Sequence, residues 1–160
     1  MSRAIIVQLT ALCLLLAPRA LQAGPPTTQQ AQAAIDAVLT DPLAAEKDGH
    51  AATVMSFAEQ SPDVSVIIDA ELLPFANDRQ DPHARLLLAS FVAGNVKSQL
   101  DAKKNKDDSY AGMKSLFKAY RAIRSTKQDY RVESIDKLEA MDNQGLLKAK
   151  VEEIQKRHGL

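Results

Sequence analysis

The sequence is poor in cysteine, tryptophan, glycine and aromatic residues, and each shortage excludes a class of protein. One cysteine cannot form an intramolecular disulfide, so a disulfide-stapled scaffold is excluded. Six scattered glycines build neither a phosphate-cradling loop nor a dinucleotide-binding fingerprint. The net charge is zero and only 4% of the residues are aromatic, so the basic charge and the stacking side chains of a nucleic-acid binder are missing. What remains, 160 residues of which 46% are hydrophobic and 25% charged, is typical of one soluble globular domain.

Residues 1–23 have the pattern of a secretory signal peptide. Arg3 gives a short positive region, and the apolar stretch 4–17 follows it. As a helix this stretch spans about 21 Å, less than the ~30 Å hydrocarbon core of a bilayer, so a cleaved signal is favoured over a membrane anchor. We expect cleavage after Ala23, with Ala20 as the alternative. The mature chain would then have no cysteine, no glycosylation sequon and no transmembrane segment, which favours a periplasmic or secreted bacterial protein.

The mature chain is divided into amphipathic helices by prolines and glycines. A leader over 24–30 is expected to be flexible, and a single domain is expected over 31–160. Apolar residues then recur at three- and four-residue spacing, which predicts helices. The expected helices cover 31–39, 51–58, 82–101, 109–126, 134–141 and 146–154. Ser109 and Ser134 are predicted to cap two of them.

The helix over 82–101 is apolar nearly all round, which indicates that other helices surround it. The predicted fold is therefore all-α, a compact array of about six helices around this central helix. The segment 63–75 leaves one question open. Its β-branched run at 64–68 permits at most one short strand, but no second strand is there to pair with it, so an extended buried connection or the start of a helix is an equal alternative.

The sequence predicts no catalytic residue, no metal site and no cofactor. Asn95 and Gln99 lie on the apolar central helix, where a buried amide must be hydrogen-bonded. We expect them to bond to backbone of the segment 63–75 or to a helix end, with a ligand-binding role as the alternative. Asp69 and Glu71 flank the ambiguous segment and complete the candidate ligand-binding set. The carboxylates over 63–81 also allow a periplasmic hydrolase. Asp78, Asp81 and His83 allow an ion site, but a helix-capping aspartate explains them better.

Charge is divided unevenly along the chain. Residues 24–82 hold 10 acidic and 2 basic residues, whereas residues 83–160 hold 10 acidic and 16 basic residues. We expect the two halves to attract each other within one domain. The competing hypothesis is a basic face over 97–131 for an anionic partner such as lipid headgroups or a polyanionic polysaccharide. Its candidate residues are Lys114, Lys118, Arg121 and Arg124.

The function expected from these features is that of a small exported helical protein. It would bind a partner without catalysing a reaction, and the partner would be another envelope protein or an anionic envelope component. Nucleic acid is not an expected partner.

Overall fold

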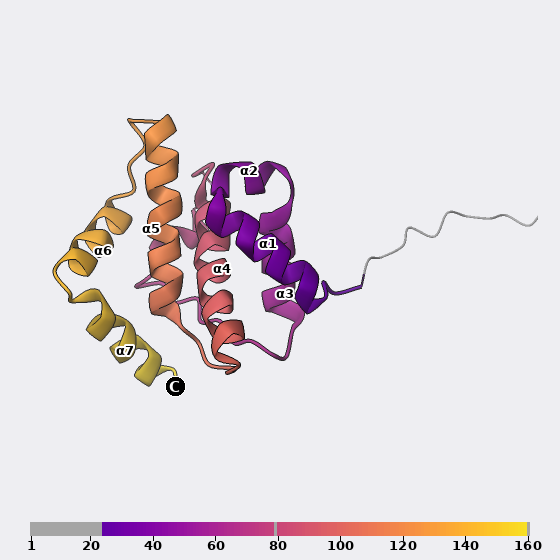
Figure 1. Ribbon diagram of the computed structural model, residues 1–160. Helices are drawn as coiled ribbons and strands as arrows, with labels where there is room; N and C mark the ends of the chain where they lie inside the picture. Colours follow the sequence, from indigo (N-terminus) through magenta and orange to yellow (C-terminus); the bar gives the residue numbers. More distant parts are fainter. Residues whose placement is uncertain (1–23, 79, 160) are drawn as a thin grey trace, which may run out of the picture.

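The computed structural model describes residues 24–78 and 80–159, so the predicted signal peptide lies outside the described residues. These residues form seven α-helices and one short 3-10 helix and contain no β-strand (Figure 1). The helices are α1 Thr28–Thr40, α2 Pro42–Lys47, α3 His50–Gln60, η1 Pro74–Asn77, α4 Ala84–Ala102, α5 Ser109–Thr126, α6 Glu133–Asn143 and α7 Leu147–Arg157. The all-α fold predicted from the sequence is confirmed.

Local capping sets where the first two helices begin. Helix α1 begins at Thr28, within the leader expected over 24–30, because Thr27 and Gln30 form a capping box. The Thr27 hydroxyl accepts the Gln30 backbone N–H at 3.3 Å, and the Gln30 side chain accepts the Thr27 N–H at 2.8 Å. Asp41 ends α1 and caps α2, where its carboxylate accepts the Ala44 N–H at 3.1 Å.

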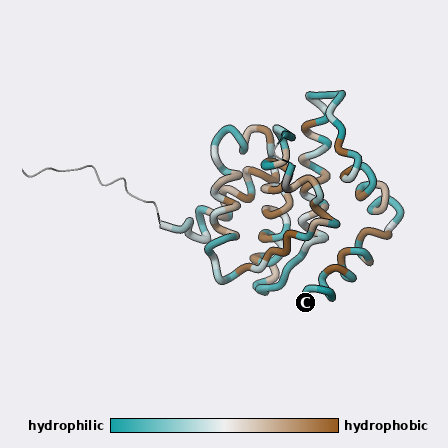
Figure 2. Tube along the Cα trace, turned by 180° about the vertical axis from the view of Figure 1, so that it is seen from behind, coloured by the Kyte–Doolittle hydropathy of each residue, from teal (hydrophilic) through white to brown (hydrophobic). Residues whose placement is uncertain are grey.

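Helix α4 is the centre of the molecule, as its all-round apolar sequence predicts. It packs against α5 on one side and against α1 and α3 on the other (Figure 1). Leu86, Leu87, Phe91 and Val96 are fully buried. Seen from behind, hydrophobic residues gather where the helices face each other, and hydrophilic residues follow the outside (Figure 2). No helix in the described ranges is both long and apolar enough to cross a membrane.

Two glycines allow α4 and α5 to approach closely. A Cβ atom built on Gly94 would lie 2.7 Å from the carbonyl oxygen of Ala111. A Cβ on Gly112 would lie 2.9 Å from the carbonyl oxygen of Phe91 and 2.8 Å from its ring. Gly94 on α4 faces α5, and Gly112 on α5 faces α4, so the close contact depends on a small residue on each helix.

Helices α6 and α7 run down the side of α5 that faces away from α1 (Figure 1). They bury Ile135, Leu138, Leu147, Val151 and Ile154.

Two predicted caps are wrong by one or two residues. Asp108, not Ser109, caps α5, because its carboxylate accepts the Ala111 N–H at 3.0 Å. Helix α6 begins before Ser134 and has no side-chain cap.

The chain over 64–69 is an extended connection without regular structure, so of the alternatives left open by the sequence the extended one is confirmed. Val64 is buried in the core, whereas Ile68 is 49% exposed. Among the described residues no strand pairs with the backbone of this segment. The side chains of Gln99 on α4 and of Asp107, in the connection between α4 and α5, take that place.

Candidate functional site

Gln99 pairs with the backbone of Ser65 in the way a neighbouring strand would. Its side-chain oxygen accepts the Ser65 N–H at 2.9 Å, and its side-chain nitrogen donates to the Ser65 carbonyl at 2.7 Å. The Gln99 residue is 2% exposed. This bond to the segment 63–75 is the one expected for a buried amide on the central helix.

Asn95 lies one turn earlier on α4 and continues the same network. Its oxygen accepts from Gln99 at 2.6 Å and from the Asp108 backbone N–H at 2.9 Å. Its nitrogen donates to the Asp107 carboxylate at 2.7 Å. Asn95 therefore holds the start of α5 against α4, which is the helix-end role predicted as the alternative to bonding the segment 63–75.

The network converges on the buried carboxylate of Asp107. Besides Asn95, its donors are the Ile67 N–H at 2.8 Å, the Ser109 N–H at 3.0 Å, the Ser109 hydroxyl at 2.7 Å and the Gln155 side chain at 2.8 Å. The Asp107 residue is 3% exposed. One carboxylate thus joins the extended segment, α4, α5 and α7, and all five donors are uncharged.

The sequence gives little sign of this role for Asp107. The run 103–108 is dominated by charge, which predicts an exposed loop, and this prediction is wrong for Asp107. The only local signal is its spacing of two residues from Ser109, which suits an aspartate that accepts a backbone N–H two residues later. Gln155 is equally hard to identify, because it lies on a polar terminal helix far away in sequence.

The carboxylates of Asp69 and Glu71 contact side chains of α7 and of His158, the residue that follows it. Nε2 of His158 lies 3.0 Å from the Asp69 carboxylate, while Lys150 and Arg157 lie 3.0 and 2.7 Å from the Glu71 carboxylate. The hydrogen bond from His158 lowers the pKa of Asp69 below its ordinary value of 3.8. The hydrogen bonds from Arg157 and Lys150 likewise lower the pKa of Glu71. Both carboxylates therefore favour the ionised form. Glu71 forms ion pairs with Lys150 and Arg157, and Asp69 forms a hydrogen bond with His158.

The carboxylates of Asp78 and Asp81 form turns. The carboxylate of Asp78 accepts the Gln80 N–H at 2.9 Å, and that of Asp81 accepts the His83 N–H at 2.8 Å. The Tyr130 hydroxyl donates to Asp81 at 2.6 Å, and burial raises the pKa of this phenol. Asp78 and Asp81 therefore form turns before α4, and the helix cap expected from an aspartate here is not formed, because α4 begins after His83 without a side-chain cap. In the described part of the chain, no group of three or more His, Cys, Asp or Glu is placed to hold a metal ion.

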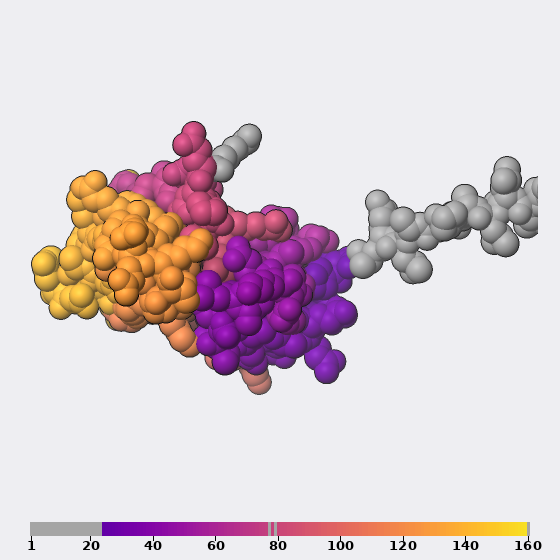
Figure 3. All heavy atoms as spheres, turned by 90° about the horizontal axis from the view of Figure 1, so that it is seen from above, coloured from indigo at the N-terminus to yellow at the C-terminus, as the bar shows by residue number. Residues whose placement is uncertain are grey.

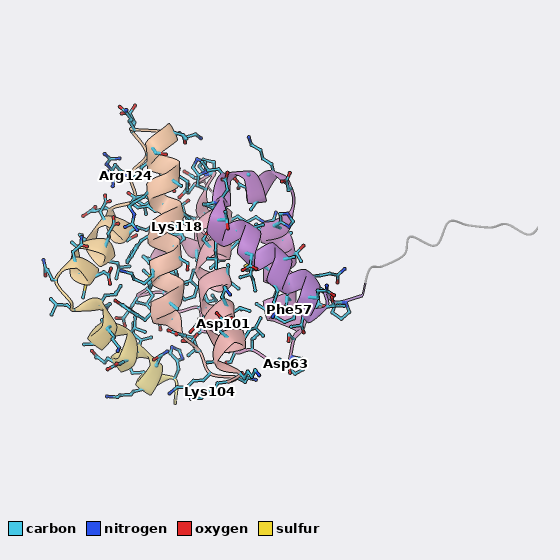
Figure 4. All side chains as sticks on the ribbon, viewed as in Figure 1. Phe57, Asp63, Asp101, Lys104, Lys118 and Arg124 are labelled. Atoms are coloured by element: carbon cyan, nitrogen blue, oxygen red, sulfur yellow. The ribbon has the colours of Figure 1, made fainter. Side chains whose placement is uncertain are left out.

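The four cations of the predicted basic face make contacts within the protein. The ammonium of Lys114 lies 2.6 Å from the Asp142 carboxylate. Arg121 pairs with Glu139, and Arg124 lies 3.4 Å from Asp136. Lys118 donates to the Leu39 carbonyl near the end of α1 (Figure 4). Three of the four therefore face carboxylates of α6.

Ion pairs also join the acidic and basic halves of the sequence. Lys97 lies 3.9 Å from Asp36, and Lys150 and Arg157 of α7 pair with Glu71. Seen from above, the N-terminal helices and the C-terminal helices lie on opposite sides of one body (Figure 3). These contacts are the ones that attraction between the two halves predicts.

A surface hollow of about 370 Å³ lies between the end of α4, the start of α5 and α7. Of the four candidate ligand-binding residues, Gln99 lines it, whereas Asn95, Asp69 and Glu71 are not among its lining residues. Three lysines and three carboxylates border it, namely Lys104, Lys106, Lys148, Asp107, Asp108 and Glu152. The hollow is therefore close to neutral.

Compared with protein-family models, with curated proteins and with solved structures, the chain matches none. What the protein can do therefore has to follow from the arrangement of its own side chains.

Proposed function

We propose that this chain is a small exported helical protein that binds a partner in the bacterial cell envelope and does not catalyse a reaction. One observation carries the non-catalytic part. The predicted polar candidates, Asn95, Gln99, Asp69 and Glu71, are all hydrogen-bonded or ion-paired within the protein. A catalytic acid or base must reach a substrate, and these groups already have partners in the fold.

The same observation speaks against a hydrolase built on Asp69, Glu71 and Asp81. Asp69 is held by His158, Glu71 by two cations, and Asp81 by a turn and by Tyr130. A pair of hydrolytic carboxylates needs one member with a raised pKa. The pKa values of Asp69 and Glu71 are shifted in the opposite direction.

The export part of the proposal is supported by the pattern of residues 1–23. The partner would be another envelope protein or an anionic envelope component. Expression of the full chain in a bacterium, followed by fractionation and intact-mass measurement, tests it. We expect the envelope fraction to contain a chain that begins at Gly24.

The matched control is Leu14→Arg, which places a charge in the apolar stretch. This variant should stay in the cytoplasm and retain residues 1–23. A wild-type chain that is cytoplasmic and uncleaved would contradict the export proposal. Hydrolysis by the purified mature chain that is lost in a folded Asp69→Asn variant would contradict the non-catalytic proposal.

A further inference from the structure

A second surface hollow, of about 500 Å³, lies at the C-terminal end of α5. Its size is within the range of small-ligand sites. Its lining residues are Arg121, Arg124, Ser125, Gln128, Arg131 and Glu139. Figure 4 shows Arg124 near the upper end of α5, at the opposite end of this helix from Lys104. Three guanidinium groups therefore converge on one hollow that has one lining carboxylate.

Two of the three guanidinium groups are anchored but keep unused donors. Arg121 uses one nitrogen on Glu139. Arg124 uses one nitrogen on Asp136, and its guanidinium carbon lies 5.4 Å from the centre of the Tyr120 ring. A guanidinium has five N–H donors in a planar fork, so both arginines retain several.

Arg131 supplies charge that is not neutralised nearby. One of its nitrogens donates to the Gln128 and Tyr130 carbonyls, each at 2.8 Å. These neutral acceptors fix the guanidinium in place, and no carboxylate in the described residues lies within 4.0 Å of it. Counting the α6 partners Glu139 and Asp136, the three arginines leave one excess positive charge at the hollow.

We propose that this hollow binds the phosphate group of a ligand, either a free phosphate or the phosphodiester of a lipid headgroup. The inference rests on the proposed function and specifies its anionic partner. Guanidinium forks match phosphate oxygens in geometry, and charge-assisted bonds of this kind are among the strong ones. The hollow near Gln99 has no such excess, because its three lysines are balanced by three carboxylates.

Two binding measurements on the mature chain test the proposal. The first is titration with inorganic phosphate at low ionic strength, followed by amide NMR shifts. The second is co-sedimentation with vesicles of phosphatidylglycerol and phosphatidylcholine against pure phosphatidylcholine. Arg131→Gln removes the uncompensated charge and leaves both ion pairs with α6 in place. We expect it to weaken binding about tenfold, the loss of one charge-assisted interaction.

Lys104→Gln is the matched control, because it removes the same charge at the other end of α5. It should bind as the wild type does. Arg131→Lys keeps the charge but not the fork, and should bind with intermediate affinity. Unchanged thermal unfolding of each variant shows that the fold is retained.

The outcomes separate the two sources of phosphate. If Arg131→Gln weakens binding only in the phosphate titration, the ligand is a free phosphate. If it weakens binding to the phosphatidylglycerol vesicles, the ligand is a lipid headgroup. No saturable binding in either arm would overturn the proposal. Equal weakening by Arg131→Gln and Lys104→Gln would also overturn it, because only net charge would then matter. None of these results depends on where the signal is cleaved, so failure here is distinct from failure of the export proposal.

Discussion

Replacement of Asp107 by asparagine should destabilise the fold far more than its place in a highly charged stretch of sequence suggests. The change keeps the shape of the side chain but turns one of its two oxygens into an NH₂ group. Oδ1 accepts the Ile67 N–H and the Asn95 amide, and Oδ2 accepts from Ser109 and Gln155. In either orientation the new NH₂ group therefore faces at least two donors.

Rotation cannot remove this conflict. The N–H groups of Ile67 and Ser109 belong to the backbone, so one of them is left without an acceptor whichever way the amide points. The Asn95 amide is also fixed, because its oxygen already accepts from Gln99 and Asp108. Each buried donor without a partner costs about 1–3 kcal/mol. We expect Asp107→Asn to lower the free energy of unfolding by about 2–4 kcal/mol, a large part of the ~5–15 kcal/mol of an ordinary domain.

Urea unfolding of Asp107→Asn beside Asp101→Asn measures this effect. Asp101 is an exposed aspartate on α4 that lies 3.2 Å from Lys97, and its loss should cost less than ~1 kcal/mol. Hydrogen exchange adds a local measurement, because the Ile67 amide should lose protection in Asp107→Asn. Equal stability of the two variants, with the Ile67 amide still protected, would refute the reasoning.

Three further predictions follow from packing and titration. Phe91→Ala should lower the free energy of unfolding by about 3–5 kcal/mol, because burial is lost and a cavity is left. Met141→Ala, at a half-buried position on α6, should lower it clearly less, and urea unfolding of both variants checks this. Gly112→Ala should cost about 1–3 kcal/mol, because its Cβ would meet the backbone of Phe91 as well as its ring; a neutral effect in the same assay would contradict the close contact. Burial raises the pKa of Asp142, but the hydrogen bonds from Lys114 and Tyr110 lower it by more, so the folded pKa lies below the ordinary 3.8. The ionised Asp142 carboxylate therefore stabilises the fold fully at pH values above its unfolded pKa, and this contribution is lost as pH falls through its folded pKa. The difference in melting temperature between the wild type and Asp142→Asn should accordingly shrink between pH 7 and pH 3.

Local patterns in the sequence predict most of the fold because they depend on neighbouring residues. The all-round apolar character of 82–101 identifies the central helix, which the structure places at Ala84–Ala102. The proline after Asp41 marks the end of one helix and the start of the next. The caps are less predictable, since Asp108 and Ser109 are both acceptable cap residues and tertiary contacts decide between them.

The candidate site was harder to predict because its partners are distant in sequence. The expectation that Gln99 bonds the segment 63–75 is correct, since a buried amide must find an acceptor and a donor. The partners of Asp107 include Ile67 and Gln155, which lie 40 and 48 residues away. Arg131 belongs to the basic stretch 97–131, but the sequence does not show that it lines one hollow with Arg121 and Arg124. Ligand binding by Asn95, Gln99, Asp69 and Glu71 stays a prediction.

The side-chain contacts of the extended segment fix the number of residues within it. Its backbone meets Gln99 at Ser65 and Asp107 at Ile67, and the Asp69 side chain meets His158, so the contacts recur at every second residue. An extended chain turns successive groups to opposite sides. One inserted or deleted residue between these points would turn the groups beyond it away from their partners. Related chains should therefore vary in the side chains of this segment while keeping its length unchanged.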